Sequence, residues 1–325
     1  MTTAEIKKAA EILRNGGLVA LPTETVYGLG ADARNETAIR KIFTAKERPY
    51  DHPLIVHLAD ISQVSDWARE ISPEALKLAN KFWPGPLTMI LKKQPGVPDI
   101  LTGNQDTIGL RIPHHPIAQA LLREFGGGVA APSANKFTHI SPTTADAVRE
   151  ELGNQVDLIL DGGECAVGVE STILDLSGKT PVILRPGMIT AELLATVLGT
   201  TVISSLTESA PLIRAPGSHH LHYAPVTPTV VLLRKNIADF LHSLRPDDLP
   251  AALITHSEVP GLNELKKIHH VQLPPDAKGY AHDLYRTLRT LDNLHFQCIV
   301  IESVPSTHEW DAIRDRLNKA SGRRV

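Results

Sequence analysis

The sequence lacks the features of several protein classes. Only two cysteines, Cys165 and Cys298, occur in 325 residues, too few and too far apart for a disulfide framework or a thiolate zinc site. No stretch approaches the 18 apolar residues of a membrane span, and charged residues spread through the first 14 positions exclude an export signal. We therefore expect a cytoplasmic protein with no membrane segment.

A strong excess of charge of one sign is also missing. The net charge is −3, with 19 basic against 23 acidic residues in 1–205 and 14 against 13 in 206–325. Proteins that grip a phosphate backbone without sequence preference have a global basic excess, which neither part shows. Non-specific nucleic-acid binding is thus disfavoured as the main role, although a local basic pocket stays open.

The order of apolar runs predicts alternating helices and strands, and hence an α/β protein. At about 150 residues per domain, the length suggests two domains. In the first we expect helices near 6–13, 36–45, 73–82, 117–125 and 143–152, and strands near 18–21, 54–58, 87–91, 129–131, 156–161, 171–176 and 181–184. In the second we expect strands near 229–233, 251–255, 268–273 and 296–301, with helices near 236–244, 278–292 and 307–320.

The stretch 204–228 differs from both halves. It contains four prolines and no periodic apolar pattern, which is typical of a linker. The sequence therefore divides into a mixed α/β domain at 1–203, a linker at 204–228, and a smaller α/β domain with parallel pairing at 229–325.

Phosphate-binding glycine loops are poorly represented. The sequence has no G-x-x-x-x-G-K-[ST] loop, which disfavours a P-loop NTPase. Gly28, Gly30 and Ala33 spell G-x-G-x-x-A, but Pro22 and the polar residues 23–25 separate them from the strand that a dinucleotide fold needs directly before them. We interpret these glycines as turn residues.

The segment 46–53 is rich in hydrogen-bond donors. Pro49 and Pro53 keep its backbone extended, so we expect a stiff loop that presents Lys46, Arg48 and His52 to phosphate oxygens. A solvated charged loop is the alternative.

Two further strands end in polar residues. Arg111 closes an apolar run that begins at Thr107, and a buried guanidinium needs a carboxylate, either from the protein or from a substrate. Ser133 and Asn135 follow the strand near 129–131, where their oxygens suit a hard cation or a phosphate, with a simple turn as the alternative.

Seven short motifs, in order, resemble the YrdC-like family of threonylcarbamoyl-AMP synthases. They are PTETVYGLG at 22–30, KERP at 46–49, PLIVH at 53–57, WPGPLT at 83–88, PSAN at 132–135, ESTI at 170–173 and RPG at 185–187. The resemblance covers about residues 5–200, and PG at 216–217 and HYAP at 222–225 extend it to the two-domain type of the family.

The resemblance implies a fold and a reaction. The fold is a twisted mixed-sheet YrdC-like catalytic domain with a large concave cavity, a linker over the active site, and a smaller Rossmann-like domain. The enzyme is a nucleotidyltransferase that makes threonylcarbamoyl-AMP, pyrophosphate and water from L-threonine, bicarbonate and ATP with Mg²⁺. Separate proteins then transfer the threonylcarbamoyl group to tRNA. Such a step needs positioning and charge neutralisation rather than a protein nucleophile, and no residue is expected as a nucleophile.

The resemblance also implies site residues. For threonine they are Thr25, His57, Arg111, Ala131 and Ser171, with Arg111 on the carboxylate. For ATP they are Lys46, Arg48, His52, Thr107, Ser133, Ser141, Arg185 and Tyr223. Ser133 and Asn135 are expected to help hold Mg²⁺.

The chain departs from the family pattern at two places. His52 stands where the family usually has asparagine, so nucleotide affinity is expected to depend on pH near neutrality. The family's linker lysine is missing before Tyr223, which puts any charge role of the linker in doubt.

Two other functions compete with the synthase. One is a non-catalytic RNA-binding or ribosome-associated protein that uses the same cavity; the overall acidity and the retained small-ligand motifs speak against it. The other is a carbamoyl-transfer module of the hydrogenase-maturation type, which the lack of flanking acylphosphatase-like and zinc-finger segments disfavours.

Overall fold

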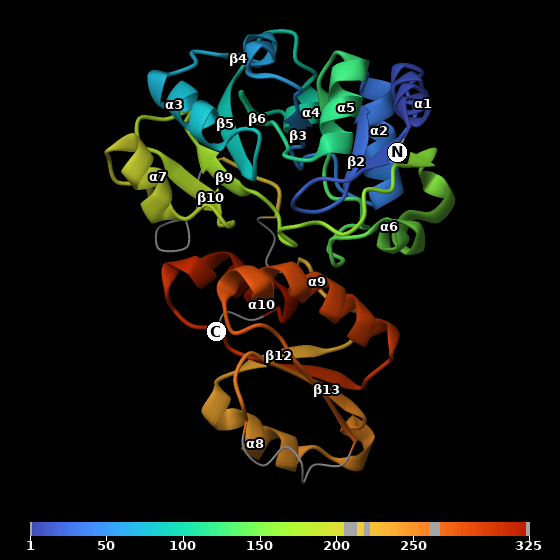
Figure 1. Cartoon of the computed structure of the whole chain (residues 1–325), viewed down its shortest axis with the longest axis vertical. Helices are drawn as coiled ribbons and strands as arrows, with labels where there is room; N and C mark the ends of the chain where they lie inside the picture. Colours follow the sequence, from blue (N-terminus) through green and yellow to red (C-terminus); the bar gives the residue numbers. More distant parts are fainter. Residues whose placement is uncertain (1, 205–212, 218–221, 260–266, 323–325) are drawn as a thin grey trace. The chain divides into compact units, whose positions relative to one another are not determined.

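The computed structural model describes residues 2–204, 213–217, 222–259 and 267–322 (Figure 1). The chain forms two compact units: unit 1 comprises Met1–Phe137 and Ser141–Ser218, and unit 2 comprises Thr138–Ile140 and His219–Val325. Of the predicted linker, 213–217 thus belongs to unit 1 and 222–228 to unit 2. Its residues 205–212 and 218–221 lie outside the described residues.

Unit 1 is built on one mixed sheet, as the family resemblance implies. Its described strands have the order β11-β10-β9-β5-β6-β3-β7-β2-β1-β8, and β4 pairs with β5. They are β1 (Val19–Leu21), β2 (Gly28–Asp32), β3 (Ile55–His57), β4 (Ala68–Arg69), β5 (Leu87–Lys93), β6 (Thr107–Arg111), β7 (Val129–Ala130), β8 (Leu158–Ile159), β9 (Thr172–Asp175), β10 (Val182–Arg185) and β11 (Ile203–Ser204). Pairs β3–β6 and β5–β9 are parallel, whereas β5–β6 is antiparallel.

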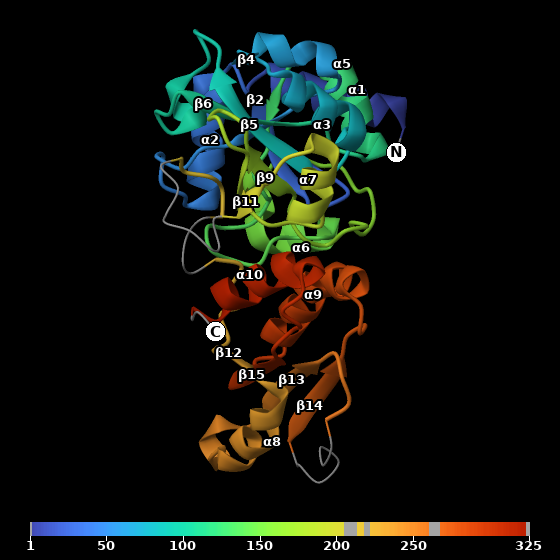
Figure 2. The same cartoon turned by 90° about the vertical axis from the view of Figure 1, so that its left-hand side faces the viewer.

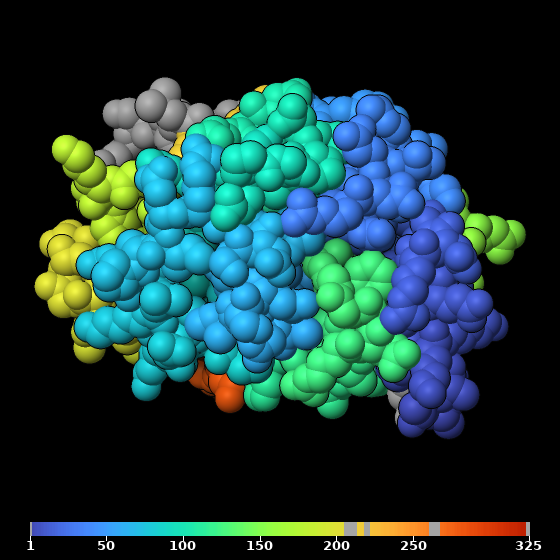
Figure 3. All heavy atoms as spheres, turned by 90° about the horizontal axis from the view of Figure 1, so that it is seen from above, coloured from blue at the N-terminus to red at the C-terminus, as the bar shows by residue number. Residues whose placement is uncertain are grey.

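Helices cover the sheet of unit 1 (Figure 2). They are α1 (Thr3–Arg14), α2 (Glu36–Lys46), α3 (Pro73–Phe82), α4 (Asp99–Thr102), α5 (Pro116–Phe125), α6 (Ala145–Leu152) and α7 (Ala191–Leu198). Helix α1 begins at a Thr2/Glu5 capping box and buries an apolar face against α5. Figure 3 shows α1 and α5 side by side at the surface of this unit.

The two faces of the sheet differ at its centre. Side chains alternate between the faces of a strand. Val56, Leu110 and Leu174 belong to the main core, which also contains residues of α2, α3 and α7. Their neighbours Ile55 and Ile173 belong to a smaller apolar cluster that Ala215 joins. Polar residues at the same parity as Ile55 and Ile173 therefore lie on the face away from the main core.

Two local expectations are wrong. Gly28 and Gly30 are strand residues of β2 rather than turn residues. Glycine is needed there because a side chain would press on the neighbouring strands: a Cβ on Gly30 would lie 2.9 Å from Leu21 Cδ2. Lys46 is the last residue of helix α2 rather than part of an extended loop. Glu47, the residue after the helix, has a left-handed backbone, and Pro49 prevents further helical turns.

Unit 2 is a small α/β domain with an all-parallel sheet, as predicted. Its described strands have the order β12-β15-β13-β14. They are β12 (Thr229–Leu232), β13 (Ala251–Thr255), β14 (Ile268–Gln272) and β15 (Cys298–Glu302), with helices α8 (Arg234–Ser243), α9 (Ala277–Asn293) and α10 (Asp311–Ala320). Within this unit, α8 lies on one face of the sheet and α9 and α10 on the other (Figure 1). In the described part of the chain, no helix combines the length and apolar character needed to cross a bilayer.

Candidate functional site

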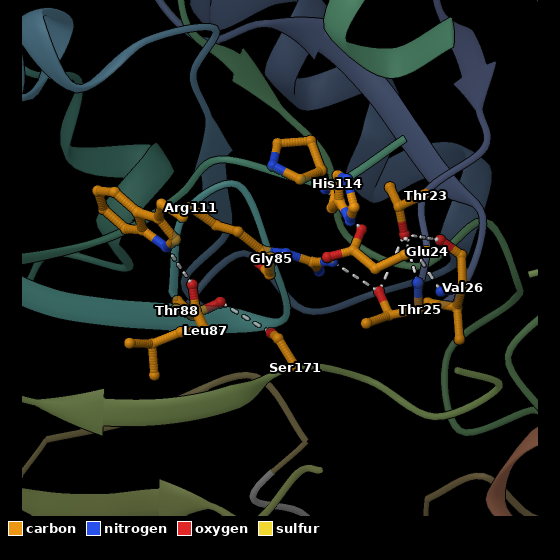
Figure 4. A network of polar contacts seen from close by, with 12 residues as sticks. Thr23, Glu24, Thr25, Val26, Gly85, Leu87, Thr88, Arg111, His114 and Ser171 are labelled. Carbon is orange, nitrogen blue, oxygen red and sulfur yellow. Dashed lines mark hydrogen bonds and ion pairs between the residues drawn. The ribbon is translucent and has the colours of Figure 1, made fainter. Parts of the chain in front are cut away.

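Four neighbouring strands bring polar side chains together on the face away from the main core. His57 ends β3, and its Cα is the register partner of Arg111 at the end of β6. Thr88 lies on β5, and Ser171 directly precedes β9, which pairs with β5. The Thr88 and Ser171 hydroxyl oxygens are 2.8 Å apart (Figure 4). The predicted threonine residues His57 and Arg111 are thus on adjacent strands, and Ser171 contacts β5, the strand on the other side of β6.

Arg111 is held in place by three groups. It is buried; its Nε donates to the Gly85 carbonyl at 3.3 Å, and its Nη2 donates to Thr25 Oγ1 at 2.9 Å. Nη2 also lies 2.9 Å from Glu24 Oε1 (Figure 4). Within the described residues, Nη1 has no hydrogen-bond acceptor. The guanidinium therefore has a structural carboxylate partner and one nitrogen left for a ligand.

Glu24 is a buried acid that the sequence analysis placed in a motif but gave no role. Its Oε2 accepts the backbone N–H of His114 at 3.0 Å. The neighbouring Thr23 hydroxyl contacts Thr25 Oγ1 at 2.9 Å and donates to the Val26 carbonyl, which fixes this turn. The signal that could have found Glu24 is its place between two threonines in an otherwise apolar stretch, because an acid there needs a partner.

His57 is buried beside a permanent positive charge. Burial and the nearby Arg111 guanidinium lower its pKa from 6.5 to about 3. The imidazole is therefore neutral at physiological pH. Its Nδ1 has no hydrogen-bond partner among the described residues.

Lys46 is buried against the segment that follows β7. Its ammonium donates to the carbonyl oxygens of Ser133 and Asn135, and burial, with Arg48 nearby, holds the Lys46 pKa well below its usual value. The predicted residues Lys46, Ser133 and Asn135 are thus brought together, although Lys46 uses their backbone oxygens rather than lying open to solvent.

The other predicted cations are also tied to backbone oxygens. Arg185 is buried and donates through Nε and Nη2 to the Ser171 carbonyl, and through Nη2 to Ser171 Oγ at 3.1 Å. Arg48 donates to the Pro53 carbonyl at 2.9 Å. Ser171 therefore links Arg185, predicted for ATP, to the threonine residues.

Two further predicted residues, Ser141 and Ala131, have polar groups that already bond within unit 1. Ser141 donates to Glu170 Oε1 at 2.5 Å, and both residues are buried. The backbone N–H of Ala131 already donates to the Ile55 carbonyl, so of its backbone polar groups only the carbonyl remains for a ligand.

Three further predicted ATP residues come from the start of a strand, from the segment after α2 and from unit 2. Thr107 begins β6, four residues before Arg111 and so about 13 Å along the strand. His52 packs edge-on against Phe137, with ring centroids 5.2 Å apart. Tyr223 belongs to unit 2, where it stacks on Tyr285 and lies under the Arg316 guanidinium.

A hollow of about 520 Å³ in unit 1 contains none of the predicted residues. It is lined by Arg14, Arg34, Trp67, the glycines 126–128 and their neighbours. Arg34 stacks on Trp67 at 4.2 Å and donates to the Asp66 carbonyl, so its charge is already used within the protein. In the described residues no group of three or more His, Cys, Asp or Glu side chains is placed to hold a metal ion.

Comparison with known proteins identifies the class. A family model for Sua5, YciO and YrdC proteins, described as "Telomere recombination", matches residues 11–187. A second model, described as "Threonylcarbamoyl-AMP synthase, C-terminal domain", matches residues 189–322. The two-unit α/β chain with its polar strand ends thus has the domain arrangement of two-domain synthases.

Individual relatives cover nearly the whole chain. It is 38% identical to the threonylcarbamoyl-AMP synthase of Pyrococcus abyssi, over 99% of this chain and 95% of the relative. It is 40% identical to the Bacillus subtilis threonylcarbamoyl-AMP synthase, over 99% and 94%. The crystal structure of P. abyssi Sua5 complexed with L-threonine has a TM-score of 0.91 and 38% identity, covering 99% of this chain and 95% of that one. The chain belongs to the Sua5/YciO/YrdC family.

Proposed function

We propose that this chain is a threonylcarbamoyl-AMP synthase, a nucleotidyltransferase that forms threonylcarbamoyl-AMP and pyrophosphate from L-threonine, bicarbonate and ATP. Relatives named for this activity match it over almost their full length. The observation that carries the proposal is the buried Arg111, which contacts Thr25 and lies beside His57, with Ser171 bonded to Thr88 of the strand next to it. A cluster of this size and polarity suits the carboxylate of a small amino acid better than an RNA backbone.

In the threonine site, Arg111 receives the substrate carboxylate. Its Nη1 is available, and charge-assisted bonds of this kind are among the strongest in proteins. Thr25 and Ser171 supply hydroxyl groups, neutral His57 supplies a ring nitrogen, and Ala131 supplies its carbonyl.

In the ATP site, cations already fixed by backbone oxygens face the phosphates. Lys46, Arg48 and Arg185 neutralise charge, while Ser133, Ser141, Thr107 and His52 contact the rest of the nucleotide. Because Arg185 also binds Ser171, the two substrates are held next to one another. The protein then acts by placing the carbamate oxygen in line with the α-phosphorus and by neutralising the leaving pyrophosphate.

The residues present fit Mg²⁺ only as an ion that binds together with ATP. Ser133 and Asn135 offer neutral oxygen donors, which suit a hard cation that keeps most of its ligands as water and phosphate. The Lys46 ammonium beside them makes a dedicated protein cage for a dication unfavourable. Bound Mg²⁺ would supply charge neutralisation on the phosphates.

Beyond its substrates, we place the enzyme in the cytoplasm, upstream of separate proteins that transfer the threonylcarbamoyl group to tRNA. A net charge of −3 gives no support to a direct, non-specific grip on tRNA. The non-catalytic RNA-binding function is therefore the alternative that the test must exclude.

The test follows the carbon of bicarbonate. Purified protein is incubated with ATP, L-threonine and ¹³C-bicarbonate, and the nucleotides are analysed by mass spectrometry. We expect a threonylcarbamoyl-adenylate that is heavier by one mass unit than the product from unlabelled bicarbonate. Tight ATP binding with no such product, together with a salt-sensitive shift of tRNA, would favour the RNA-binding function.

A further inference from the structure

The proposed threonine site contains a buried carboxylate, Glu24, in addition to the residues that would bind the threonine carboxylate. Glu24 is 7% exposed. Its Oε2 is satisfied by the His114 N–H, whereas Oε1 lies 2.9 Å from Arg111 Nη2 without hydrogen-bond alignment and has no other donor among the described residues. A buried carboxylate oxygen with no aligned donor is costly. The site thus offers an acceptor for a donor that a ligand brings.

The substrate brings such a donor to the right place. Glu24 Oε1 lies 2.9 Å from Arg111 Nη2, and Nη1 is the other terminal nitrogen of the same guanidinium. The amino nitrogen of an α-amino acid is separated from its carboxylate by a single carbon atom. When Arg111 holds the carboxylate, the amino group therefore lies within reach of the acid that touches Arg111.

Carbamate formation requires a proton acceptor at that nitrogen. A threonine ammonium and a bicarbonate ion give a carbamate, one water and one proton. The bicarbonate hydroxyl takes one ammonium proton, which frees the nitrogen lone pair; the N–C bond then forms, the bond from carbon to that oxygen breaks, and water leaves. The nitrogen must lose a second proton, which needs a base beside it.

On the basis of the proposed function, we propose that Glu24 is a catalytic residue whose Oε1 accepts this second proton from the threonine nitrogen and passes it to solvent. The N-carboxylated nitrogen is far more acidic than an ammonium because the new carboxyl group withdraws electrons, so a carboxylate is a sufficient base. Once the proton has left, the carbamate oxygen is ready to attack the α-phosphorus.

The neighbouring groups do not fill this role. Burial and Arg111 lower the His57 pKa to about 3, so its imidazole cannot keep a proton near neutrality. Burial raises the pKa of the Cys165 thiol, which therefore stays protonated. Ser171 Oγ already contacts both Thr88 and Arg185.

The experiment compares Glu24→Gln with wild type in two measurements. One is kcat for pyrophosphate release at saturating ATP, threonine and bicarbonate across a pH series; the other is L-threonine affinity by calorimetry. Glutamine keeps the shape of the side chain and an oxygen for the His114 N–H but removes the base. Glu150→Gln, an exposed change of the same kind on α6, is the matched control. The charged and titratable groups that face Glu24 are Arg111, His114, His115 and Cys165, and both variants retain them.

We expect kcat of Glu24→Gln to fall about a hundredfold or more at saturating threonine, and the acid limb of the wild-type pH profile to disappear. Glu24→Asp should recover part of kcat together with the acid limb. A Glu24→Gln enzyme that keeps most of the wild-type kcat, or that loses kcat but keeps the acid limb, overturns the proposal. If neither Glu24 variant binds threonine, Glu24 only anchors Arg111 and the proposal also fails. A wild-type protein that releases no pyrophosphate refutes the proposed function itself, which is a separate outcome.

Discussion

Arg111 is the residue that most directly links this fold to an amino-acid substrate. We predict that Arg111→Ala weakens L-threonine binding by roughly ten- to a hundredfold, since a charge-assisted hydrogen bond contributes about 1.5–3 kcal/mol. ATP affinity should change much less. Calorimetry with each ligand measures both, and Arg123→Ala, an exposed arginine on α5, is the control. Threonine affinity equal to that of wild type removes Arg111 from this role.

The lowered pKa of His57 makes the stability of the protein depend on pH. Its imidazole binds a proton near pH 6.5 when unfolded but only near pH 3 when folded. Below pH 6.5 the unfolded state therefore binds more protons, and stability falls as the pH falls toward 3. Between pH 7 and 5, this group removes about 2 kcal/mol from the free energy of unfolding, a loss that His57→Gln lacks.

Urea unfolding at the two pH values tests this. A Trp310→Phe background restricts tryptophan fluorescence to Trp67 and Trp83, both in unit 1. His114→Gln, an exposed histidine, should keep the wild-type pH dependence. The same loss between pH 7 and 5 in wild type and His57→Gln is the result that excludes a buried neutral imidazole.

For single residues, the sequence predicted which side chains would need a polar partner better than it predicted which residue the partner would be. Arg111 was expected to need a carboxylate from either the protein or a substrate, and the structure supplies the protein's, from Glu24. Glu24 was not singled out because its partner lies on a strand far along the chain. The burial of Lys46 was missed for a similar reason: its acceptors follow a different strand, β7.

Among the elements, strand β15 ends in an acid that holds the loop after β13. Glu302 is buried, and it accepts the backbone N–H groups of His256 and Ser257 and the Ser257 hydroxyl. We predict that Glu302→Ala lowers the free energy of unfolding of unit 2 by about 3 kcal/mol, because three partly buried donors lose their acceptor. Trp310 fluorescence during urea unfolding measures this free energy. Glu309→Ala, which changes an exposed acid, is the control. An unchanged transition midpoint contradicts the capping role.

Elements with a clear apolar pattern of their own were predictable even when short, as for β7, whereas strands β2 and β4 were not. Helix α1 and strand β5 follow from apolar spacing, because one buried face dictates the pattern. Strand β2 was missed because Gly28 and Gly30 leave no apolar alternation to detect. Strand β4 has only two residues and forms through its pairing with β5, which no local pattern encodes.

At the scale of the whole molecule, the contacts of segment 213–217 predict how truncation changes thermal stability. Arg214 exchanges backbone hydrogen bonds with the Gln105 side chain, and Ala215 packs in the smaller apolar cluster of unit 1. A chain that ends at 217 should therefore melt at a higher temperature than one that ends at 204. Both should release no pyrophosphate, because the resemblance implies a linker over the active site, and both chains end before residue 228. Thermal unfolding and pyrophosphate release measure this, and full activity in a folded truncation contradicts it.

The most direct test of the account is pyrophosphate release by the full-length protein with ATP, measured with and without L-threonine and with and without bicarbonate. The account predicts release only when both are present, because the carbamate formed from them is the nucleophile that displaces pyrophosphate. Release with ATP alone, or with threonine but no bicarbonate, would contradict it, as would no release at all under conditions where ATP binds.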